Sequence, residues 1–271
     1  MSAYSLVASD YDLTLAALPG GRMTQRVIDT LRTLQEMGVP IAIASGRGPA
    51  GIEHNLALHH IDPTGFYYCG YNGAEIVEAS SGTHIASSRL DGTLARSVFD
   101  VIHEYPVEAM AHLHGRVYSA HPEGFHAQVD AKSNGLQLFP IDAEGVAALR
   151  PSKFLVAGEP EDLHSVEQRL RGEFGAAIEV VFSADFLLEV NAAGTDKGWG
   201  LRALAEAVGV PIAETVAFGD NFNDIPLIQA AGLGVAMGNA VHDLLEAADR
   251  IAPSCYDDGF ATVVDELFGE D

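Results

Sequence analysis

The stretch Leu6-Val7-Ala8-Ser9-Asp10-Tyr11-Asp12-Leu13-Thr14 places a short apolar run directly before two carboxylates. Residues 6–9 have the pattern of a buried strand. Ligands of open parallel sheets bind at the carboxyl ends of the strands, where Asp10 and Asp12 would then lie. One carboxylate there could attack an electrophile while the other carries a proton, provided that a cation reduces their repulsion. Because an isolated Asp-x-Asp is more often a solvated acidic turn, the rest of the chain has to decide between these interpretations.

The first 78 residues continue with alternating helix and strand patterns. A helix is predicted after Thr24, which can cap it, and before Gly38, which ends it. Its apolar positions recur with helical spacing: Val27, Ile28, Leu31, Leu34 and Met37. Further apolar strands are predicted over 39–44 and 65–69. This alternation favours a parallel sheet with helices on both faces.

The same alternation returns over 201–252, whereas the middle of the chain differs. Residues 107–120 alternate as a half-buried strand does, with Glu108, Met110, His112 and His114 on one side. Strands are also predicted over 153–157, 178–182 and 186–190, and a helix over 161–174. We therefore predict an α/β fold, with a Rossmann-like doubly wound parallel sheet as its core. The core would contain residues 1–79 and 191–271, and an α+β domain with an open-faced sheet, residues 80–190, would be inserted.

Composition restricts the partners. The 271 residues are 48% hydrophobic and 20% charged, enough for a real core and incompatible with wholesale disorder. Acidic residues outnumber basic ones by 38 to 15, giving a formal charge of −23. We expect neither nucleic acid nor an anionic membrane as a partner, because both require Lys and Arg. The start resembles no signal peptide, no apolar run has the length of a membrane span, and a cytoplasmic location is expected.

Two further polar groups follow predicted strands or begin a helix. Ser45-Gly46-Arg47 follows a strand and offers a hydroxyl and backbone N–H groups suited to a phosphate, although Ser-Gly is also ordinary turn chemistry. Lys197 opens a predicted helix, where a cation opposes the helix dipole. Its position makes sense if an anion lies nearby. The alternative is a surface lysine that turns into solvent.

The last group is Gly219-Asp220-Asn221-Phe222-Asn223-Asp224, again at a predicted strand end. Two carboxylates and two amides within five residues are the hard oxygen ligands that suit Mg²⁺. Asn223 or Asp224 could equally cap the following helix, and the two roles are compatible.

Together these motifs resemble those of the haloacid dehalogenase (HAD) superfamily of phosphatases, in the order Asp10-x-Asp12-x-Thr14, Ser45, Lys197 and Gly219-Asp220-x-x-Asn223-Asp224. The long insert resembles the α/β cap of the Cof-type, sucrose-phosphatase-like branch. That branch is also similar at 72–74, 234–240 and 257–259. Leu13 replaces the glycine usual after the second aspartate; we expect activity to be kept and loop flexibility to change.

The resemblance implies a mechanism. Asp10 would attack phosphorus to form an aspartyl-phosphate, and Asp12 would act as acid and then as base. Mg²⁺ would be held by the Asp10 carboxylate, the Asp12 carbonyl and Asp220. The phosphoryl oxygens would be bound by Ser45, Lys197, Asn223 and the backbone N–H groups of Tyr11 and Gly46. Three further residues would hold these groups in position without touching the phosphate: Thr14, Arg47 and Asp224. Asp224 would do so by orienting Lys197 or a metal-bound water.

The function expected first is Mg²⁺-dependent hydrolysis of a small-molecule phosphate ester, with sugar and polyol phosphates as the first candidates. One alternative is a phosphotransferase or mutase of the phosphomannomutase type, and another is a non-catalytic protein that binds a phosphometabolite. His112 and His114 form a His-x-His pattern that can also bind a metal, but spacing fixes no third ligand. A solvated or substrate-facing pair of histidines is the preferred interpretation.

Overall fold

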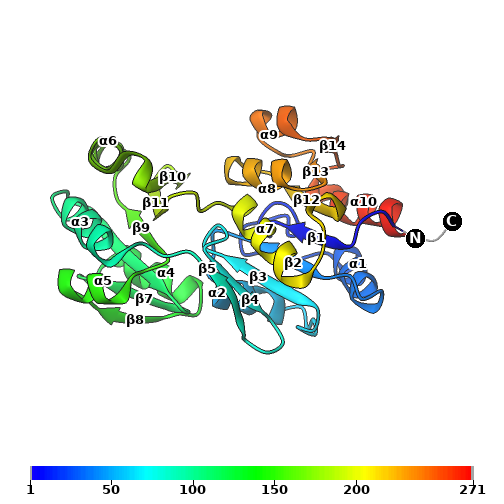
Figure 1. Cartoon of the computed structure of the whole chain (residues 1–271), viewed down its shortest axis with the longest axis horizontal. Helices are drawn as coiled ribbons and strands as arrows, with labels where there is room; N and C mark the ends of the chain where they lie inside the picture. Colours follow the sequence, from blue (N-terminus) through cyan, green and yellow to red (C-terminus); the bar gives the residue numbers. More distant parts are fainter. Residues whose placement is uncertain (1, 270–271) are drawn as a thin grey trace. The chain divides into compact units, whose positions relative to one another are not determined.

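The computed structural model describes residues 2–269, which form two compact units (Figure 1). The first contains the residues up to Ala86 and those from Asp196 onward, and the second runs from Ser87 to Thr195. The predicted boundaries at 79/80 and 190/191 fall a few residues earlier. The first boundary differs because β5 (His84–Ser87) continues the sheet of the first unit beyond β4 (Glu75–Glu78).

The first unit has a sheet of eight described strands in the order β14-β13-β12-β1-β2-β3-β4-β5. Its strands from β14 to β3 pair in parallel, and β4 runs antiparallel to β3. The parallel strands are β1 (Leu6–Ser9), β2 (Ile41–Ala44), β3 (Phe66–Gly70), β12 (Thr215–Gly219), β13 (Leu233–Ala236) and β14 (Arg250–Ile251). The predicted parallel core sheet is confirmed.

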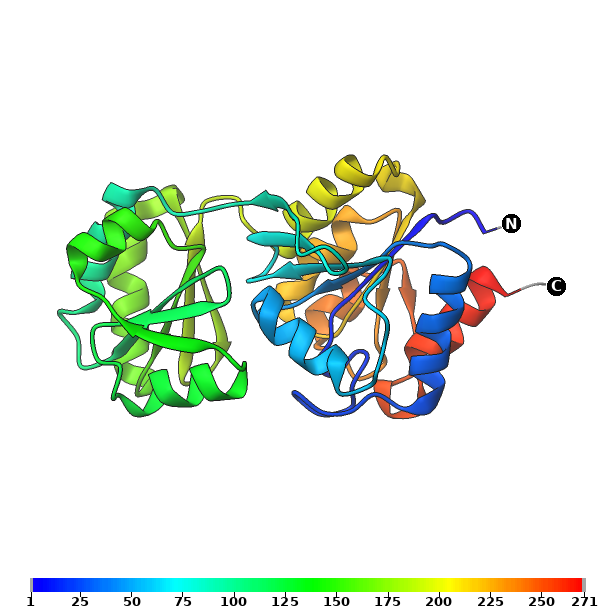
Figure 2. The same ribbon diagram turned by 90° about the horizontal axis from the view of Figure 1, so that it is seen from below.

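Helices cover both faces of this sheet (Figure 2). On one face lie α1 (Gln25–Glu36), α2 (Pro49–Ala57) and α10 (Gly259–Phe268), and α1 and α10 are neighbours. On the other lie α7 (Lys197–Val208) and α8 (Ile225–Ala230), and α9 (His242–Ala247) packs against α8. Thr24 caps α1 as predicted, accepting the N–H of Val27. Throughout residues 2–269, each helix is too short or too polar to cross a membrane.

The second unit is an α+β sandwich around a six-stranded sheet in the order β10-β11-β9-β6-β7-β8. Its strands are β6 (Glu108–Leu113), β7 (Arg116–Ser119), β8 (Gln137–Pro140), β9 (Lys153–Ala157), β10 (Ile178–Ala184) and β11 (Leu187–Ala192). Its helices are α3 (Gly92–Ile102), α4 (Phe125–Ser133), α5 (Ala143–Leu149) and α6 (Pro160–Phe174). The helices α3, α5 and α6 share one apolar core with the sheet, and α4 packs on the opposite face.

The alternating stretch 107–120 is a hairpin rather than one strand, and its polar side is not open. The chain turns at His114 and Gly115, both with positive φ, so His114 leaves the alternation. Glu108 accepts two backbone N–H groups at the start of α4. His112 is buried, with its Nε2 3.1 Å from Asp130 Oδ2 on α4. The expected open face of the sheet is therefore closed in part, where α4 packs on it.

Asp130 gives the second unit a testable pH dependence. Burial raises the pKa of its carboxyl, but the charges of His112 and Lys153 outweigh burial and lower that pKa overall. Because the folded pKa is depressed, the stabilisation is present above the unfolded value of about 3.9 and is lost as the pH falls through the lower folded value. We expect Asp130→Asn to destabilise the protein by about 1–3 kcal/mol near neutral pH. The difference from wild type should shrink below about pH 4 in thermal unfolding; a constant difference would contradict this account.

Candidate active site

Three neighbouring parallel strands bring the predicted site residues to one edge of the sheet. Asp10 directly follows β1, Ser45 follows β2 and Asp220 follows β12, and β1 lies between the other two strands. Lys197 is the first residue of α7. One carboxylate oxygen from each of Asp10, Asp220 and Asp224 lies within 4.8 Å of the others. The edge of the sheet therefore gathers the catalytic candidates, as expected from the strand order.

Lys197 is buried at the centre of this cluster, with 1% of its surface exposed. Its Nζ donates to Asp10 Oδ1 at 2.7 Å and to Asp224 Oδ1 at 2.5 Å. Burial disfavours the charged amine, but the two carboxylates outweigh that effect and hold the pKa of Lys197 above its usual value. The surface-lysine interpretation is therefore wrong, and the ammonium group is a fixed positive charge beside Asp10.

Asp224 is fully buried, and both of its oxygens are engaged. Besides contacting Lys197, it accepts the backbone N–H groups of Asp220 and Asn221, each at 3.0 Å, through Oδ2. Gly219 makes this packing possible, since a Cβ at that position would lie 2.4 Å from the Asp224 Cβ. Asp224 thus closes a capping box whose N-cap is Asn221 while it also contacts Lys197; the sequence had offered Asn223 or Asp224 as the N-cap.

The cluster carries more negative charge than Lys197 can balance. Burial raises the pKa of Asp10 well above its usual range, and the nearby Asp224 and Asp220 add to the rise that Lys197 opposes. Burial, and then Asp224, raise the pKa of Asp220 to about 7, although the Thr14 hydroxyl donates to Asp220 Oδ1 at 3.0 Å. Three carboxylates and one ammonium leave two uncompensated negative charges when all are ionised. A divalent cation matches that excess in charge and in its preference for oxygen ligands.

Asp12 lies in a more open environment than Asp10: its side chain is 27% exposed, against 10% for Asp10. Its Oδ2 is 3.1 Å from Arg47 Nε, and its Oδ1 accepts the backbone N–H of Gly20 at 2.5 Å. Ser45, which is buried, accepts the Arg47 backbone N–H through Oγ at 3.2 Å. The two aspartates are therefore differentiated, one buried beside a lysine and one partly exposed beside an arginine.

The residues predicted through their backbone also lie at this edge. Tyr11 separates Asp10 from Asp12, and Gly46 follows Ser45. The Tyr11 side chain itself is buried, and its hydroxyl donates to the Gly21 carbonyl at 3.0 Å. Tyr11 thereby holds the following loop against the core, a role that the sequence did not suggest.

Leu13 adopts the backbone conformation that the usual glycine would supply. Its φ is +60°, in the left-handed region that favours glycine. Two hydrogen bonds hold it there: its N–H donates to the Ala16 carbonyl at 2.7 Å, and its carbonyl accepts Asn239 Nδ2 at 2.9 Å. Asn239 belongs to the stretch 234–240 that matched the family, but sequence assigned it no role. The loop is thus kept in shape by contacts rather than by glycine.

Two substitutions at Leu13 should separate the effect of its strained backbone from the effect of losing its side chain. Leu13→Gly relieves the left-handed strain, so we expect stability within about 1 kcal/mol of wild type and activity within a few-fold. Leu13→Val places a β-branched residue at positive φ, and we expect a loss of about 1–3 kcal/mol together with lower turnover. Chemical denaturation and initial rates on one phosphate ester measure both effects. Equal damage by Gly and Val would show that the backbone conformation is not what matters.

Asn223 has a partner that sequence analysis missed. Its Nδ2 donates to Asn72 Oδ1 at 3.0 Å, and Asn72 is buried in the turn between β3 and β4. Asn72 belongs to the Asn-Gly-Ala stretch that resembled the family, yet the tripeptide reads as ordinary turn chemistry. No local signal could have linked it to a residue 151 positions away.

Comparison with known proteins agrees with this geometry. Residues 7–264 match the family model of the haloacid dehalogenase-like hydrolases. The chain belongs to this family. An HMP-PP phosphatase of Citrobacter koseri is 28% identical to this HAD-like hydrolase over 257 residues, covering 89% of this chain and 86% of the relative.

Solved structures of HAD-like hydrolases share the fold over nearly the whole chain. A haloacid dehalogenase-like hydrolase from Bacteroides thetaiotaomicron superimposes with a TM-score of 0.85 at 28% identity, covering 98% of this chain and all of the other. BT1666 from the same organism, a phosphatase of the superfamily, gives a TM-score of 0.79 at 25% identity, covering 97% and 95%. Family and relatives together identify this HAD-like hydrolase as a phosphatase, which acts on phosphate esters.

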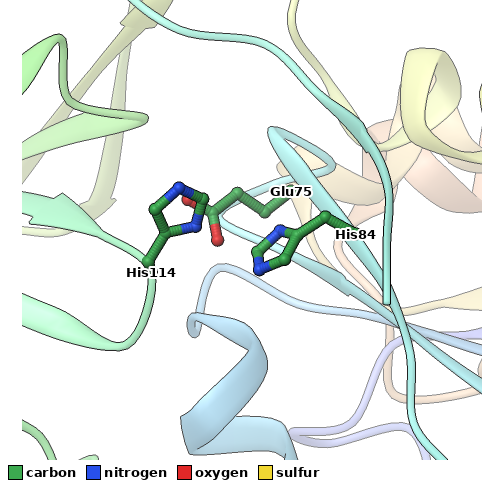
Figure 3. Close-up of side chains that lie close together, drawn as sticks. All are labelled: Glu75, His84 and His114. Carbon is green, nitrogen blue, oxygen red and sulfur yellow. The ribbon is translucent and has the colours of Figure 1, made fainter. Parts of the chain in front are cut away.

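The first unit of the hydrolase also holds a carboxylate–histidine pair, which consists of Glu75 on β4 and His84 on β5 (Figure 3). One ligand atom of each lies within 4.8 Å of the other, and Glu75 is fully buried whereas His84 is exposed. His114, also drawn there, belongs to the second unit, where Arg89 approaches its Nε2 at 2.6 Å. Sequence analysis did not predict the Glu75–His84 pair, which is separate from the carboxylate cluster of Asp10, Asp220 and Asp224.

Proposed function

We propose that this phosphatase is Mg²⁺-dependent and hydrolyses a small phosphorylated metabolite, a sugar or polyol phosphate, through an aspartyl-phosphate. The observation that carries the proposal is the buried Asp10 carboxylate, 2.7 Å from Lys197 Nζ and surrounded by two further carboxylates. A carboxylate approaches an anionic phosphate only when positive charge lies between them. Lys197 supplies part of that charge, and the excess negative charge of the cluster calls for more.

The donor set fits Mg²⁺. The carboxylates of Asp10 and Asp220, with the backbone carbonyl of Asp12, would hold the ion. Asp224 is the weaker candidate among the three clustered carboxylates, because its oxygens already serve Lys197 and two backbone N–H groups. When bound, Mg²⁺ supplies Lewis-acid neutralisation of the phosphoryl charge.

The first half of the reaction uses the two aspartates in different roles. Asp10 forms a bond to phosphorus while the bond from phosphorus to the ester oxygen breaks, and Asp12 gives that oxygen a proton. Ser45, Lys197 and Asn223, with the N–H groups of Tyr11 and Gly46, hold the phosphoryl oxygens in line. The partial exposure of Asp12 supports its role, because an acid must meet the leaving group and then exchange with water.

The second half reverses the use of Asp12. It takes a proton from water, whose oxygen attacks phosphorus and releases phosphate, and Asp10 leaves as a carboxylate. Arg47, 3.1 Å from Asp12, keeps the carboxylate in place between the two halves. We assign to the second unit, Ser87–Thr195, the exclusion of water and the selection of the leaving group, in the manner of a cap.

A panel of phosphate esters, including sugar and polyol phosphates and HMP-PP, tests the proposal. We expect phosphate release that EDTA abolishes and Mg²⁺ restores. Acid quenching in the steady state should trap a covalent phosphoryl group on Asp10, found by peptide mass spectrometry. Full turnover in EDTA, or turnover only of phosphate donors other than sugar and polyol esters, would refute the corresponding part of the proposal.

A further inference from the structure

The turn between β3 and β4 has an unusual backbone. Tyr71, Asn72 and Gly73 all have positive φ, at 53°, 54° and 88°. Left-handed backbone is uncommon outside glycine, and for a bulky residue such as Tyr71 it is an outlier. Such conformations persist only where the surroundings over-determine them, and they cluster at functional sites. The turn therefore requires an explanation beyond chain reversal.

Its backbone is tied to the loop after β2. The Tyr71 N–H donates to the Arg47 carbonyl at 2.8 Å, and the Asn72 N–H donates to the Ser45 carbonyl at 2.9 Å. Ser45 and Arg47 are the residues that the proposed mechanism places at the phosphoryl group and beside Asp12. The strained turn is thus hydrogen-bonded directly to the backbone of both residues.

Its other side packs on the start of α7, the helix that begins at Lys197. A Cβ on Gly73 would lie 2.5 Å from the Asp196 carbonyl oxygen, and one on Gly200 would lie 2.8 Å from the Gly73 Cα. Only two glycines allow so close an approach. The turn consequently spans the space between the Ser45 loop and the Lys197 helix, which leaves Asn72 between them.

The Asn72 side chain connects this turn to Asn223. It is 7% exposed, and its Oδ1 accepts Asn223 Nδ2 at 3.0 Å. A carboxamide presents donors at one end and an acceptor at the other, and only the donor end suits an anionic oxygen. An amino group has two N–H bonds, so one can serve Asn72 while the other serves a phosphoryl oxygen.

We propose that Asn72 is a positioning residue for phosphate: it fixes the carboxamide of Asn223 so that an N–H rather than a carbonyl faces the phosphoryl group. The assignment rests on the proposed function, in which Asn223 binds that group. Without Asn72, the Asn223 carboxamide can rotate and present its oxygen to the anion. The left-handed backbone of the turn holds Asn72 within hydrogen-bonding distance of Asn223.

A double-mutant cycle tests this inference. Asn72→Gly removes the carboxamide but accepts positive φ without strain, so folding should be kept. We expect this variant to raise KM for the ester and Kd for inorganic phosphate, measured by calorimetry, about tenfold, the effect of one hydrogen bond to a charged group. In an Asn223→Ala background, the same substitution should change phosphate binding less than about twofold.

The outcomes separate this inference from the proposed function. Equal losses in both backgrounds, or no loss in either, would overturn the role of Asn72 while leaving ester hydrolysis by the wild type intact. A third outcome is that the two substitutions are non-additive for phosphate binding as expected, while the wild type releases no phosphate from esters. That outcome would overturn the proposed function and support the positioning of Asn223. A melting temperature of Asn72→Gly equal to or above that of wild type confirms that lost folding does not explain the result.

Discussion

Asp10→Asn should abolish phosphate release while leaving the fold as stable as before or more so. We expect kcat to fall by at least about 10⁴-fold, because the carboxamide is a poor nucleophile and the substitution leaves the rest of the site in place. In EDTA, the melting temperature of the variant should stay equal to that of wild type or rise. Burial and the neighbouring carboxylates raise the pKa of Asp10 well above its usual range, so its ionised form is disfavoured in the folded protein.

The sign follows from linkage. A carboxyl whose folded pKa is raised loses stability as the pH rises from its unfolded value to its folded value. Near neutral pH, the uncharged carboxamide of the Asp10→Asn variant avoids that loss, so the melting temperature of the variant in EDTA should equal or exceed that of wild type. Asp29→Asn, the same substitution on the exposed face of α1, is the matched control and should change neither quantity. If the Asp10→Asn variant kept its turnover, Asp10 would not be the nucleophile. If its melting temperature fell strongly, the account in which ionised Asp10 is disfavoured in the folded protein would be wrong.

Asp10 was predictable because its position follows from a local pattern and a general rule. An apolar run before Asp10, another before Ser45 and a third before Asp220 predict strands, and neighbouring parallel strands end at the same edge. The convergence of these residues therefore needed only the strand order. Lys197 required more, because a lysine at a helix start has a solvent-exposed alternative that only the tertiary structure excludes.

Other features left no local trace in the sequence. Helix α4 buries little more than Ala127 and Ala131 while exposing Phe125 and Val129, so its apolar pattern does not mark a buried face. It was missed, and with it the cover over His112. The strand β5 is short and mostly exposed, which explains why the predicted first boundary falls too early. In both cases tertiary contacts, rather than periodicity, determine the element.

The supporting contacts of the site were also beyond sequence reasoning, for a different reason. Asn239 contacts the Leu13 carbonyl across 226 positions, and Asn72 contacts Asn223 across 151. Both asparagines stand in short Gly- and Asn-containing stretches that predict turns equally well without any partner. Sequence therefore identified the residues proposed to meet the phosphate and, through the family resemblance, Asp224 beside Lys197, whereas the contacts of Asn72 and Asn239 emerged only from the fold.

Lys197→Met should damage both catalysis and stability, unlike Asp10→Asn. The methionine keeps the length of the side chain but removes the ammonium group that contacts Asp10 and Asp224. Those carboxylates would then face each other and Asp220 without compensation, and breaking a buried ion pair in this way costs about 3–5 kcal/mol. We expect kcat/KM to fall by at least about 10³-fold, because the positive charge that meets the phosphoryl oxygens is lost.

Two comparisons separate these effects. Lys153→Met removes the other buried lysine of an ion pair, 3.1 Å from Glu189 in the second unit, and should lower stability to a similar extent. Lys197→Met in an Asp10→Asn background should cost less stability than in wild type, since one of the uncompensated carboxylates is gone. Denaturant titrations in EDTA measure this coupling. If the two substitutions were additive, the contact between Lys197 and Asp10 would carry no energy of its own, and the proposed charge balance of the site would fail.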